Sequence, residues 1–465
     1  MPDHAPVPSS PVGPAYARWT SSGAFMLAAV GAGIGLGSIW RFPYVTGANG
    51  GGAFVLIYVL AAFGIVMPVL VAELIIGRRG GGNPVRSIAQ LAREAGVSPL
   101  WRYFGVIGMV ATFLVFSYSS VFASWAVPYM VRLGNGAFAN ASPDAVRAAY
   151  DAFVDDPITL ICLHGAFCLV VAMLVAQGLH DGLERAFKIL VPLFIAVLLG
   201  LVVYSGLNGA LAATAQFLLR PDFATLRLTG VLTAIGSAFF NVTVGFGIMM
   251  TFGAYLDRSA NLTRAAAVIV AADVVMSLLV GFAVFPIVFA YHLNPAEGPG
   301  LVFVTMTTAF AQMPAGQVVG ALFFLLMTLA ALTSAIAALE PLVAWAMERH
   351  GWQRSEAALG FAAAAWLLGI GINFSFNVAR DIHPLSAIPI FARATVFQVI
   401  DSLTSDGLIP IAGVSLLIFS GWRLTPDIVR EELSPISPFW LKLGNLLVRW
   451  LAPATLLTIV ALKEL

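Results

Sequence analysis

Hydrophobic residues occur in long runs along this chain, and the polar and charged residues gather in the stretches between them. A run of about 20 apolar residues is long enough for a helix to cross a lipid bilayer. The runs therefore predict an all-α polytopic membrane protein with about 11 transmembrane helices. The predicted spans cover residues 19–42, 52–77, 101–131, 157–177, 186–206, 229–256, 262–292, 316–347, 356–374, 396–421 and 438–462.

The composition of the chain supports a location in the lipid bilayer. Of its 465 residues, 60% are hydrophobic and 10% are charged, and the mean hydropathy is +0.92. A soluble domain of this length would be far more polar. The net charge of +1 gives no reason to expect a nucleic-acid partner, and nothing points to an obligate protein partner. The sequence carries no zinc-protease, P-loop or nucleophile-elbow motif, so we expect neither enzymatic activity nor an organic cofactor.

The basic residues between the predicted spans indicate the orientation of the chain. With a cytoplasmic N-terminus, about fifteen Lys and Arg residues lie on the cytoplasmic side and about seven outside, as the positive-inside rule requires. An odd number of spans then places the C-terminus outside. Residues 1–17 are proline-rich and weakly charged, so we expect a flexible cytoplasmic tail, followed by a single domain over residues 18–465.

Glycines interrupt two of the predicted spans. Gly31, Gly33, Gly35 and Gly37 fall within the first span, in GAGIGLGSIWRFPY. Each glycine costs a helix about 1 kcal/mol relative to alanine, and a broken backbone inside the bilayer must be buried in protein or line a cavity. The sixth span, SAFFNVTVGFGIMMTFGAY, has two glycines just after a polar Asn and Thr. The alternative explanation is close helix packing through small residues.

The two interrupted spans lie five spans apart, which predicts an inverted repeat of two five-helix halves with broken helices 1 and 6. The first repeat covers residues 18–207, the second covers residues 229–421, and residues 438–462 form an eleventh span. Interrupted segments in matching positions of two halves indicate a transport site near the midplane of the bilayer. There, free carbonyls suit a cation, and the amides that open a half-helix suit an anion.

Four motifs in this sequence resemble those of the neurotransmitter:sodium symporters, in particular the eleven-span bacterial amino-acid transporters of the leucine-transporter type. They are GLGSIWRFPY, NGGGAF at Asn49–Phe54, SAFFNVTVGFG, and ALTSAIAALEP at Ala331–Pro341. The likeness runs through nearly all spans in order. It implies a sodium-coupled secondary active symporter that imports a neutral, hydrophobic or aromatic amino acid by alternating access. It also implies a bacterial-type inner membrane location.

The resemblance implies two sodium sites. The second family site (Na2) combines backbone carbonyls of the first span with hydroxyls of the eighth, and oxygen ligands of this kind suit a small hard cation. Alternatively, these hydroxyls bond back to their own helix. The first site (Na1) differs from the family, because the amide and the hydroxyl have exchanged places. The matching positions are Gly31, Ile34, Ala330, Thr333 and Ser334 for Na2, and Gly33, Ser38, Asn241 and Asp273 for Na1.

Asp273 is the one charged residue of the segment DVVMSLLVGFAVFP, and an isolated carboxylate inside a membrane is costly. A nearby sodium ion would stabilise it. In chloride-dependent relatives an anion lies near the position of Ser277, so the resemblance implies that Asp273 replaces chloride and that transport is chloride-independent. The alternatives are a proton that cycles on Asp273 during the return step, and a protonated Asp273 that hydrogen-bonds to its neighbours.

The resemblance also implies a substrate site between the two breaks. Amine-transporting relatives carry an Asp at the position of Gly35, so here the substrate should bring its own carboxylate. The family's carboxylate-binding Tyr falls at Ser119, and Tyr118 should point elsewhere on its helix. A water, a local helix distortion or a substrate other than an α-amino acid would each account for this. The implied substrate residues are Gly33, Gly35, Gly37, Val115, Ser119, Phe240, Asn241, Thr243, Phe246, Ser334 and Ala338.

Two gates complete the set of residues that the resemblance implies. Arg41, Phe240 and Asp401 would close the outer path. A cytoplasmic latch would consist of Arg18, Trp19, Tyr255 and Glu348, although Arg18 could equally be a positive-inside anchor. Glu73 and Glu340 are interpreted as structural carboxylates, with a proton-linked role as the alternative.

Two other functions remain open from the sequence. A proton-coupled amino-acid transporter of the same fold would use buried carboxylates in place of sodium. A non-transporting solute sensor would bind its ligand and signal through its cytoplasmic face.

Overall fold

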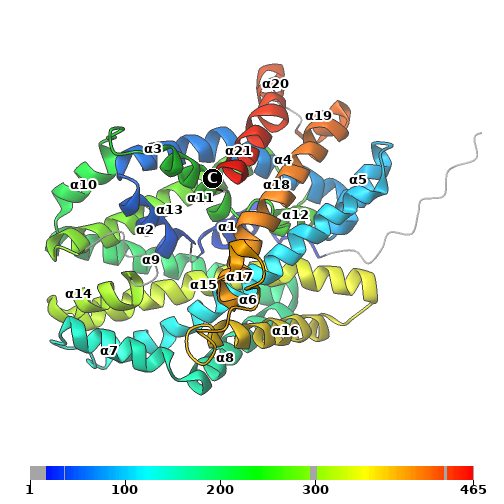
Figure 1. Cartoon of the computed structure of the whole chain (residues 1–465). Coiled ribbons are helices and arrows are strands. Elements are labelled where there is room, and N and C mark those ends of the chain that lie inside the picture. The colour runs from blue at the N-terminus through cyan, green and yellow to red at the C-terminus, as the bar shows by residue number, and fades with distance from the viewer. Residues whose placement is uncertain (1–16, 36, 294–300, 434–436, 464–465) are drawn as a thin grey trace, which may run out of the picture.

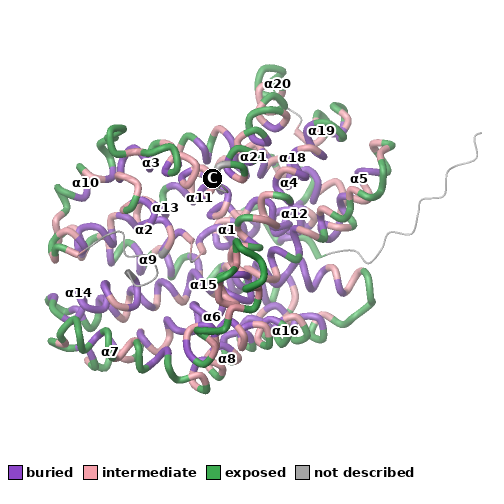
Figure 2. Tube along the Cα trace, in the orientation of Figure 1, coloured by how far each residue is buried: buried purple, intermediate pink, exposed green. Residues whose placement is uncertain are grey.

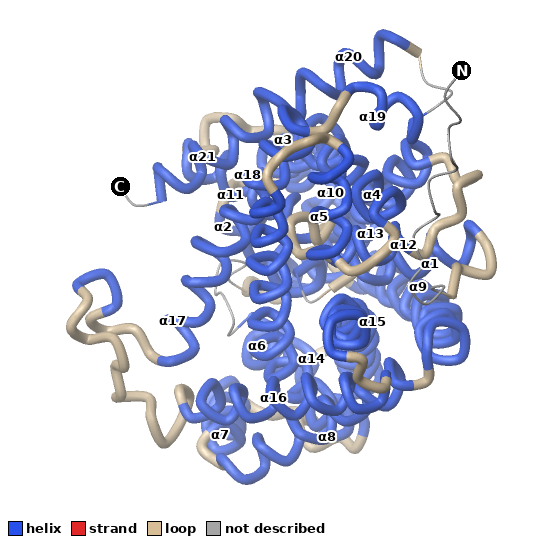
Figure 3. The backbone as a smooth tube through the Cα atoms, turned by 90° about the vertical axis from the view of Figure 1, so that its right-hand side faces the viewer, coloured by secondary structure: helices blue, strands red, loops and turns tan. Residues whose placement is uncertain are grey.

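The computed structural model describes residues 17–35, 37–293, 301–433 and 437–463. The predicted tail falls almost entirely outside these described residues. Within them the chain is helical, and Figure 3 shows helices joined by loops, with no strand in the described part of the chain. The predicted fold class is therefore confirmed.

Nine segments of the described chain are helical, long and apolar enough to cross a membrane. They closely follow the predicted spans because each one coincides with an apolar run. The helices involved are α3 (Gly52–Ala61) with α4 (Met67–Gly80), α6 (Arg102–Gly134), α8 (Pro157–Ala176), α9 (Arg185–Asn208), α13 (Leu262–Ala290), α15 (Gly316–His350), α16 (Arg354–Phe374), α17 (Val396–Ser402) with α18 (Ile409–Ile418), and α20 (Pro438–Leu446) with α21 (Ala452–Lys463).

The first and sixth predicted spans are interrupted, as the glycines predict. The first comprises α1 (Ser22–Gly33), a π-helical turn at Gly37–Arg41, and α2 (Phe42–Ala48), and its two parts are bent by 58°. The sixth comprises α11 (Leu228–Asn241) and α12 (Ile248–Ala254). Each half is shorter than a bilayer requires. The two halves of the sixth span together match its predicted range, whereas the first span continues to Ala48, beyond its predicted end at residue 42.

Short helices lie at both ends of the bundle. Figure 1 shows α7 (Pro143–Val154), α10 (Leu211–Leu219) and α14 (Thr307–Gln312) at the left end, in loops where the orientation predicts the outside. At the opposite end lie α5 (Pro84–Glu94) and α19 (Pro426–Leu433), which the apolar runs do not predict.

Local sequence signals mark the start of α5. The Asn83 side chain accepts hydrogen bonds from the backbone N–H groups of Val85 and Arg86, and Pro84 occupies the first helical position. Asparagine as an N-cap and proline at the first helical position are both favoured at helix starts. A search for helix caps would therefore have found this helix, whereas a search for apolar runs could not.

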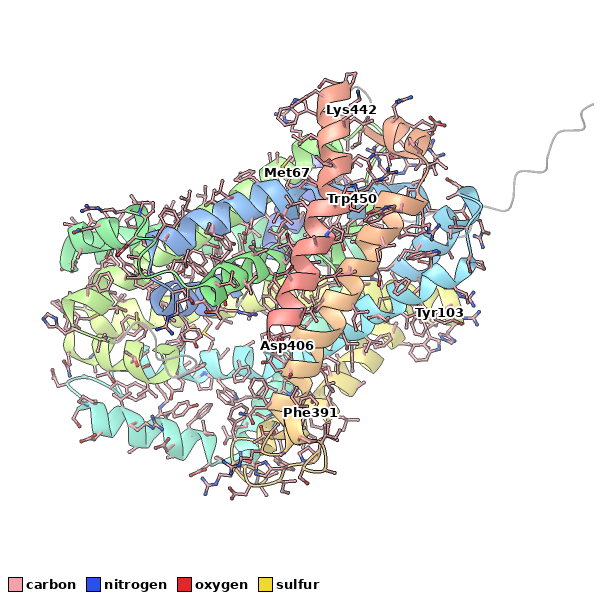
Figure 4. The ribbon with its side chains drawn as sticks, turned by 45° about the horizontal axis from the view of Figure 1, so that its top comes forward. Met67, Tyr103, Phe391, Asp406, Lys442 and Trp450 are labelled. Carbon is pink, nitrogen blue, oxygen red and sulfur yellow. The ribbon has the colours of Figure 1, made fainter. Side chains whose placement is uncertain are left out.

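The buried residues concentrate around α1, α6 and α15, and the exposed residues lie on the outer helix faces (Figure 2). α6 packs along α15, and α8 packs along α16. The last two spans lie side by side, since α18 contacts α21. Figure 4 shows this pair. Lys442 and Trp450 lie along the final span, and Asp406 and Phe391 lie near the opposite end of the pair from Lys442. The two interrupted spans are thus held inside a shell of continuous helices.

Glycine allows a close approach between α4 and α12. A Cβ on Gly77 would collide with the carbonyl group of Met250, and a Cβ on Gly253 would come within 3.0 Å of the Leu74 carbonyl oxygen. Small residues at such contacts let two membrane helices pack backbone to backbone. The position of α12, and so of the second break, depends on this contact.

We expect Gly77→Ala to destabilise the protein, because the added methyl group must push α4 away from α12. Overpacking of this kind typically costs about 1–3 kcal/mol. Gly64→Ala is the matched control, since nothing lies within 4 Å of the Cβ that it would add. Thermal unfolding in detergent measures both variants, and equal melting temperatures would contradict the assignment of this contact.

Candidate functional site

The first break exposes backbone groups in the middle of the bundle. α1 ends at Gly33, and Ile34 leaves the helix with φ −75° and ψ 76°. The Gly35 N–H donates to the Gly33 carbonyl at 2.8 Å, and the Ser38 N–H donates to the Gly35 carbonyl at 3.1 Å. This tight turn replaces the regular helical bonds, so carbonyls at the end of α1 are available to other partners.

The second break lies opposite, between Asn241 and Gly247. Thr243, Gly245 and Gly247 have positive φ angles of 57°, 91° and 78°. Glycine adopts such angles without steric cost, which explains the two glycines in this motif. The left-handed conformation of Thr243 is uncommon for a residue with a β-branched side chain.

Side chains from neighbouring helices satisfy the backbone of this second break. Glu73 on α4 accepts a hydrogen bond from the Gly245 N–H at 2.9 Å. Thr112 on α6 donates to the Phe246 carbonyl at 2.5 Å. Broken backbone inside a membrane protein requires such partners. The Glu73 contact accords with its interpretation as a structural carboxylate.

A cavity of about 80 Å³ lies between the two breaks. All eleven residues that the resemblance implies for the substrate site line it. The sequence analysis missed seven further lining residues, although most of them continue an i, i+3 or i+4 pattern along α6 and α15 that could have revealed them. These are Ala32, Thr112, Ser120, Ala123, Ile248, Ala331 and Ala335.

Four of the five residues expected at Na2 meet where α15 passes the end of α1. The Thr333 hydroxyl lies 3.5 Å from the Ile34 carbonyl and donates to the Ala330 carbonyl at 2.9 Å. The Ser334 hydroxyl lies 3.4 Å from the Ala32 carbonyl. The fifth, Gly31, lies in α1. Oxygens of α1 and α15 thus lie close together here. The Thr333 hydroxyl also makes the bond to its own helix that the alternative interpretation expects, whereas the Ser334 hydroxyl bonds to α1.

A second cluster of polar groups surrounds Tyr58, a residue that the sequence analysis did not select. The Tyr58 hydroxyl donates to Asp273 Oδ2 at 2.5 Å and accepts from Asn241 Nδ2 at 3.0 Å. Ser277 Oγ lies 3.4 Å from the same hydroxyl. The available signal was a tyrosine in a predicted span whose other polar side chain is Glu73.

Three buried oxygens beside this cluster make no hydrogen bond of ordinary length and angle among the described residues, although the Ser38 hydroxyl interacts with the Asp273 carboxylate: Ser38 Oγ, Asn241 Oδ1 and Asp273 Oδ1. Buried polar atoms almost always have partners, so such atoms require an explanation. A carboxylate, an amide oxygen and a hydroxyl form the type of ligand set that a small hard cation prefers. These are the side-chain oxygens expected at Na1, and their chemistry fits a sodium ion.

The end of the cavity that is predicted to face outside carries the expected aromatic and basic groups. The Arg41 guanidinium lies 5.1 Å from the ring centroid of Phe240. Asp401 on α17 accepts a hydrogen bond from Ser405 at 3.1 Å. Tyr118 packs against Phe397, with ring centroids 6.1 Å apart. Tyr118 thus faces α17, while Ser119 faces the cavity.

At the end of the bundle that the sequence predicts to be cytoplasmic, the residues of the expected latch fall into separate groups. The Trp19 indole N–H donates to the Phe252 carbonyl at 3.0 Å, and its ring packs against that of Tyr255. Tyr255 in turn donates to Glu340 at 2.7 Å, and Glu340 forms an ion pair with Arg354. Trp19 and Tyr255 therefore belong to one network.

Arg18 and Glu348 have other partners. Arg18 pairs with Asp257 at 3.2 Å, and both side chains are largely exposed. Glu348 pairs with Arg86 at 3.2 Å and accepts the Asn83 N–H at 2.7 Å. The reason is the unpredicted helix α5, whose N-terminus presents a backbone donor and a positive dipole end to this carboxylate.

Known proteins resemble this chain along most of its length. The sodium:neurotransmitter symporter family matches residues 16–139 and 158–376. An uncharacterised sodium-dependent transporter of Bacillus subtilis (strain 168) is 33% identical over 417 residues, which cover 90% of this chain and 90% of the relative. The chain belongs to the sodium:neurotransmitter symporter family. A similar transporter of Haemophilus influenzae is 29% identical and covers 95% of this chain and 96% of its own.

A solved structure of this symporter family has the same fold. The crystal structure of MhsT in complex with L-phenylalanine matches with a TM-score of 0.86 and 34% sequence identity, and it covers 96% of this chain and 99% of the MhsT chain. The chain is therefore a multi-pass membrane protein and a sodium-dependent symporter, not an enzyme. The family and the fold predicted from the motifs are confirmed.

Proposed function

We propose that this symporter imports a neutral, hydrophobic or aromatic amino acid together with two sodium ions, independently of chloride. The observation that carries the proposal is the cavity between the two breaks, with unpaired oxygens of Asn241 and Asp273 beside it. The likeness to MhsT, whose structure contains L-phenylalanine, supports this substrate class.

The site should bind the substrate by its carboxylate and its side chain separately. Gly35 lines the cavity and has no side chain, so this position offers no carboxylate to pair with a substrate amine. The substrate carboxylate then faces the amides of the first break and the Na1 ion. The apolar side chain lies among Val115, Phe240 and Phe246.

The two ions should occupy the two clusters of oxygens. Na1 takes side-chain oxygens of Ser38, Asn241 and Asp273 with backbone of Gly33, and Na2 takes carbonyls of α1 and α15 with the Thr333 and Ser334 hydroxyls. Each sodium ion that moves down a potential of about 100 mV releases about 2.3 kcal/mol. Two ions thus release about 4.6 kcal/mol, enough for more than thousandfold accumulation at 1.4 kcal/mol per factor of ten.

The remaining assignments belong to the same proposal. Residues 18–465 act as one transporter domain, with residues 18–207 and 229–421 as inverted halves, in a bacterial-type inner membrane. The N-terminus is cytoplasmic and the C-terminus lies outside. Asp273 supplies the negative charge that chloride supplies elsewhere, and its bond to Tyr58 beside Ser277 supports this role.

Uptake into proteoliposomes tests the proposal. An inward sodium gradient should drive accumulation of phenylalanine or another apolar amino acid, with equal rates in chloride and in gluconate. Uptake that responds to a proton gradient and ignores sodium would support the proton-coupled alternative. Binding without any uptake would support the sensor.

We expect Arg41→Ala to reduce uptake strongly while sodium-dependent binding of the amino acid persists. Arg41 lies over Phe240 at the outer end of the cavity, so its loss opens the outer path without removing an oxygen ligand. Closure over bound ligands couples occupancy to conformation. The control is Arg147→Ala on exposed α7. Normal uptake by Arg41→Ala would contradict the gate.

A further inference from the structure

A buried histidine lies directly behind one wall of the cavity. His164 on α8 is 0% exposed, and the proposed sodium and substrate sites do not use it. An ionisable side chain inside a membrane-spanning bundle is costly and marks a functional position by default. Its contacts therefore indicate what it does.

The imidazole is held in a slot between three helices. His164 Nε2 lies 2.8 Å from Ser120 Oγ on α6 and 3.2 Å from Cys168 Sγ, one turn further along α8. Gly369 on α16 faces the ring, and a Cβ at that position would collide with it. The ring is therefore fixed by a glycine on one side and by a hydrogen bond on the other.

The hydrogen-bond partners select the tautomer. His164 Nδ1 has no partner among the described residues, so a proton on Nδ1 would be a buried donor without an acceptor. The tautomer protonated on Nε2 donates to Ser120 Oγ, and the Ser120 hydroxyl then donates to the Ser117 carbonyl at 3.1 Å. Ser120 is thus engaged both as an acceptor and as a donor.

Ser120 is itself a residue of the cavity wall. The other four hydroxyls of the cavity wall also donate to backbone carbonyls. None of them is therefore left as a free hydrogen-bond donor to the substrate. In Ser120 one of the two lone pairs of the oxygen is engaged as well, by His164 from outside the wall, and the Cys168 thiol lies 3.9 Å from the same oxygen. The other four hydroxyls are those of Thr112, Ser119, Thr243 and Ser334.

We propose that His164 is a positioning residue that engages one lone pair of the Ser120 hydroxyl, holds this hydroxyl away from the substrate and thereby makes the site prefer apolar over hydroxyl-bearing amino acids. This inference rests on the proposed function and names a determinant of its selectivity. Without His164, a lone pair on Ser120 becomes available to a donor on the substrate. Threonine would gain from this change, whereas valine, which has nearly the same shape, would not.

A competition assay tests the inference. Valine and threonine each compete with radiolabelled phenylalanine for sodium-dependent binding to the purified protein. Because the two competitors have nearly the same shape, changes in packing affect both alike. We expect His164→Leu and His164→Asn, whose shorter amide cannot reach Ser120, to lower the preference for valine over threonine by about three- to tenfold, the effect of one hydrogen bond. His164→Gln, whose amide nitrogen can take the place of Nε2, should restore most of the preference.

The Ser120→Ala background separates this role from a purely structural one. If His164 acts through Ser120, His164→Leu and His164→Asn have no effect on the valine-to-threonine ratio once the hydroxyl is gone, as in a double-mutant cycle. An unchanged ratio in the single variants, or the same change in both backgrounds, would overturn the inference. Failure of the unmodified protein to bind any neutral amino acid in sodium would instead overturn the proposed function, and the inference with it.

Discussion

Replacing Asp273 with alanine is expected to lower sodium-dependent substrate binding by at least about 100-fold. The carboxylate is buried, and one of its oxygens makes no hydrogen bond of ordinary length and angle among the described residues, so it is available to the proposed Na1 ion. Loss of one partner of a buried charge pair costs about 2–5 kcal/mol, and a factor of 100 corresponds to about 2.8 kcal/mol. The substrate also loses affinity because its carboxylate would contact the same ion.

Two variants serve as controls for Asp273. Asp273→Asn keeps the shape and an oxygen but removes the charge, so under the chloride proposal its residual uptake should increase when chloride is supplied. Ser277→Ala removes a hydroxyl that lies 3.4 Å from Tyr58 and leaves the three unpaired oxygens in place. We expect a much smaller effect from it. Binding curves measured across sodium concentrations compare all three, and wild-type sodium affinity in Asp273→Ala would refute the Na1 assignment.

Replacing Glu340 with leucine is expected to destabilise the protein by about 3–5 kcal/mol, because it leaves Arg354 as a poorly solvated charge without its partner. Glu340 is 0% exposed, and 18% of the Arg354 side chain is exposed. Arg354 also donates to the Val175 carbonyl at 2.8 Å, which ties α16 to α8. Tyr255 loses its acceptor at the same time.

The double variant Glu340→Leu/Arg354→Leu should recover much of this loss, because it removes both charges from the interior. The exposed pair Arg147–Asp151 on α7 provides a control, since exposed ion pairs contribute little. Thermal unfolding in detergent compares the variants. Equal melting temperatures for Glu340→Leu and the Arg147→Ala control would show that the Glu340 pair has no structural role.

The spans and their two interruptions could be predicted because each depends on local sequence. A membrane helix needs a continuous apolar run, and the glycines of the two breaks stand out against such runs. The lining of the cavity could also be placed by resemblance, as the positions of Phe240 and Ser334 illustrate. The helix α5 was missed because its signal is a cap at Asn83, not hydrophobicity.

The polar networks could not be predicted because they depend on which helices meet. In the sequence, Tyr58 is only an aromatic residue inside a predicted span. Its hydroxyl lies between Asn241 and Asp273 because α3, α11 and α13 pack together in the fold. In the same way, Glu348 pairs with Arg86 only because α5 folds back onto the end of α15. Sequence spacing along one helix carries no information about such contacts.

The most direct test of coupled sodium and amino-acid sites is the melting temperature of the purified protein in sodium and in potassium, with and without a panel of amino acids. A ligand that binds only the folded state raises the melting temperature by mass action. We expect sodium to stabilise the protein, and apolar or aromatic amino acids to stabilise it further in sodium but not in potassium. Equal melting temperatures in sodium and potassium with every amino acid would contradict the central claim.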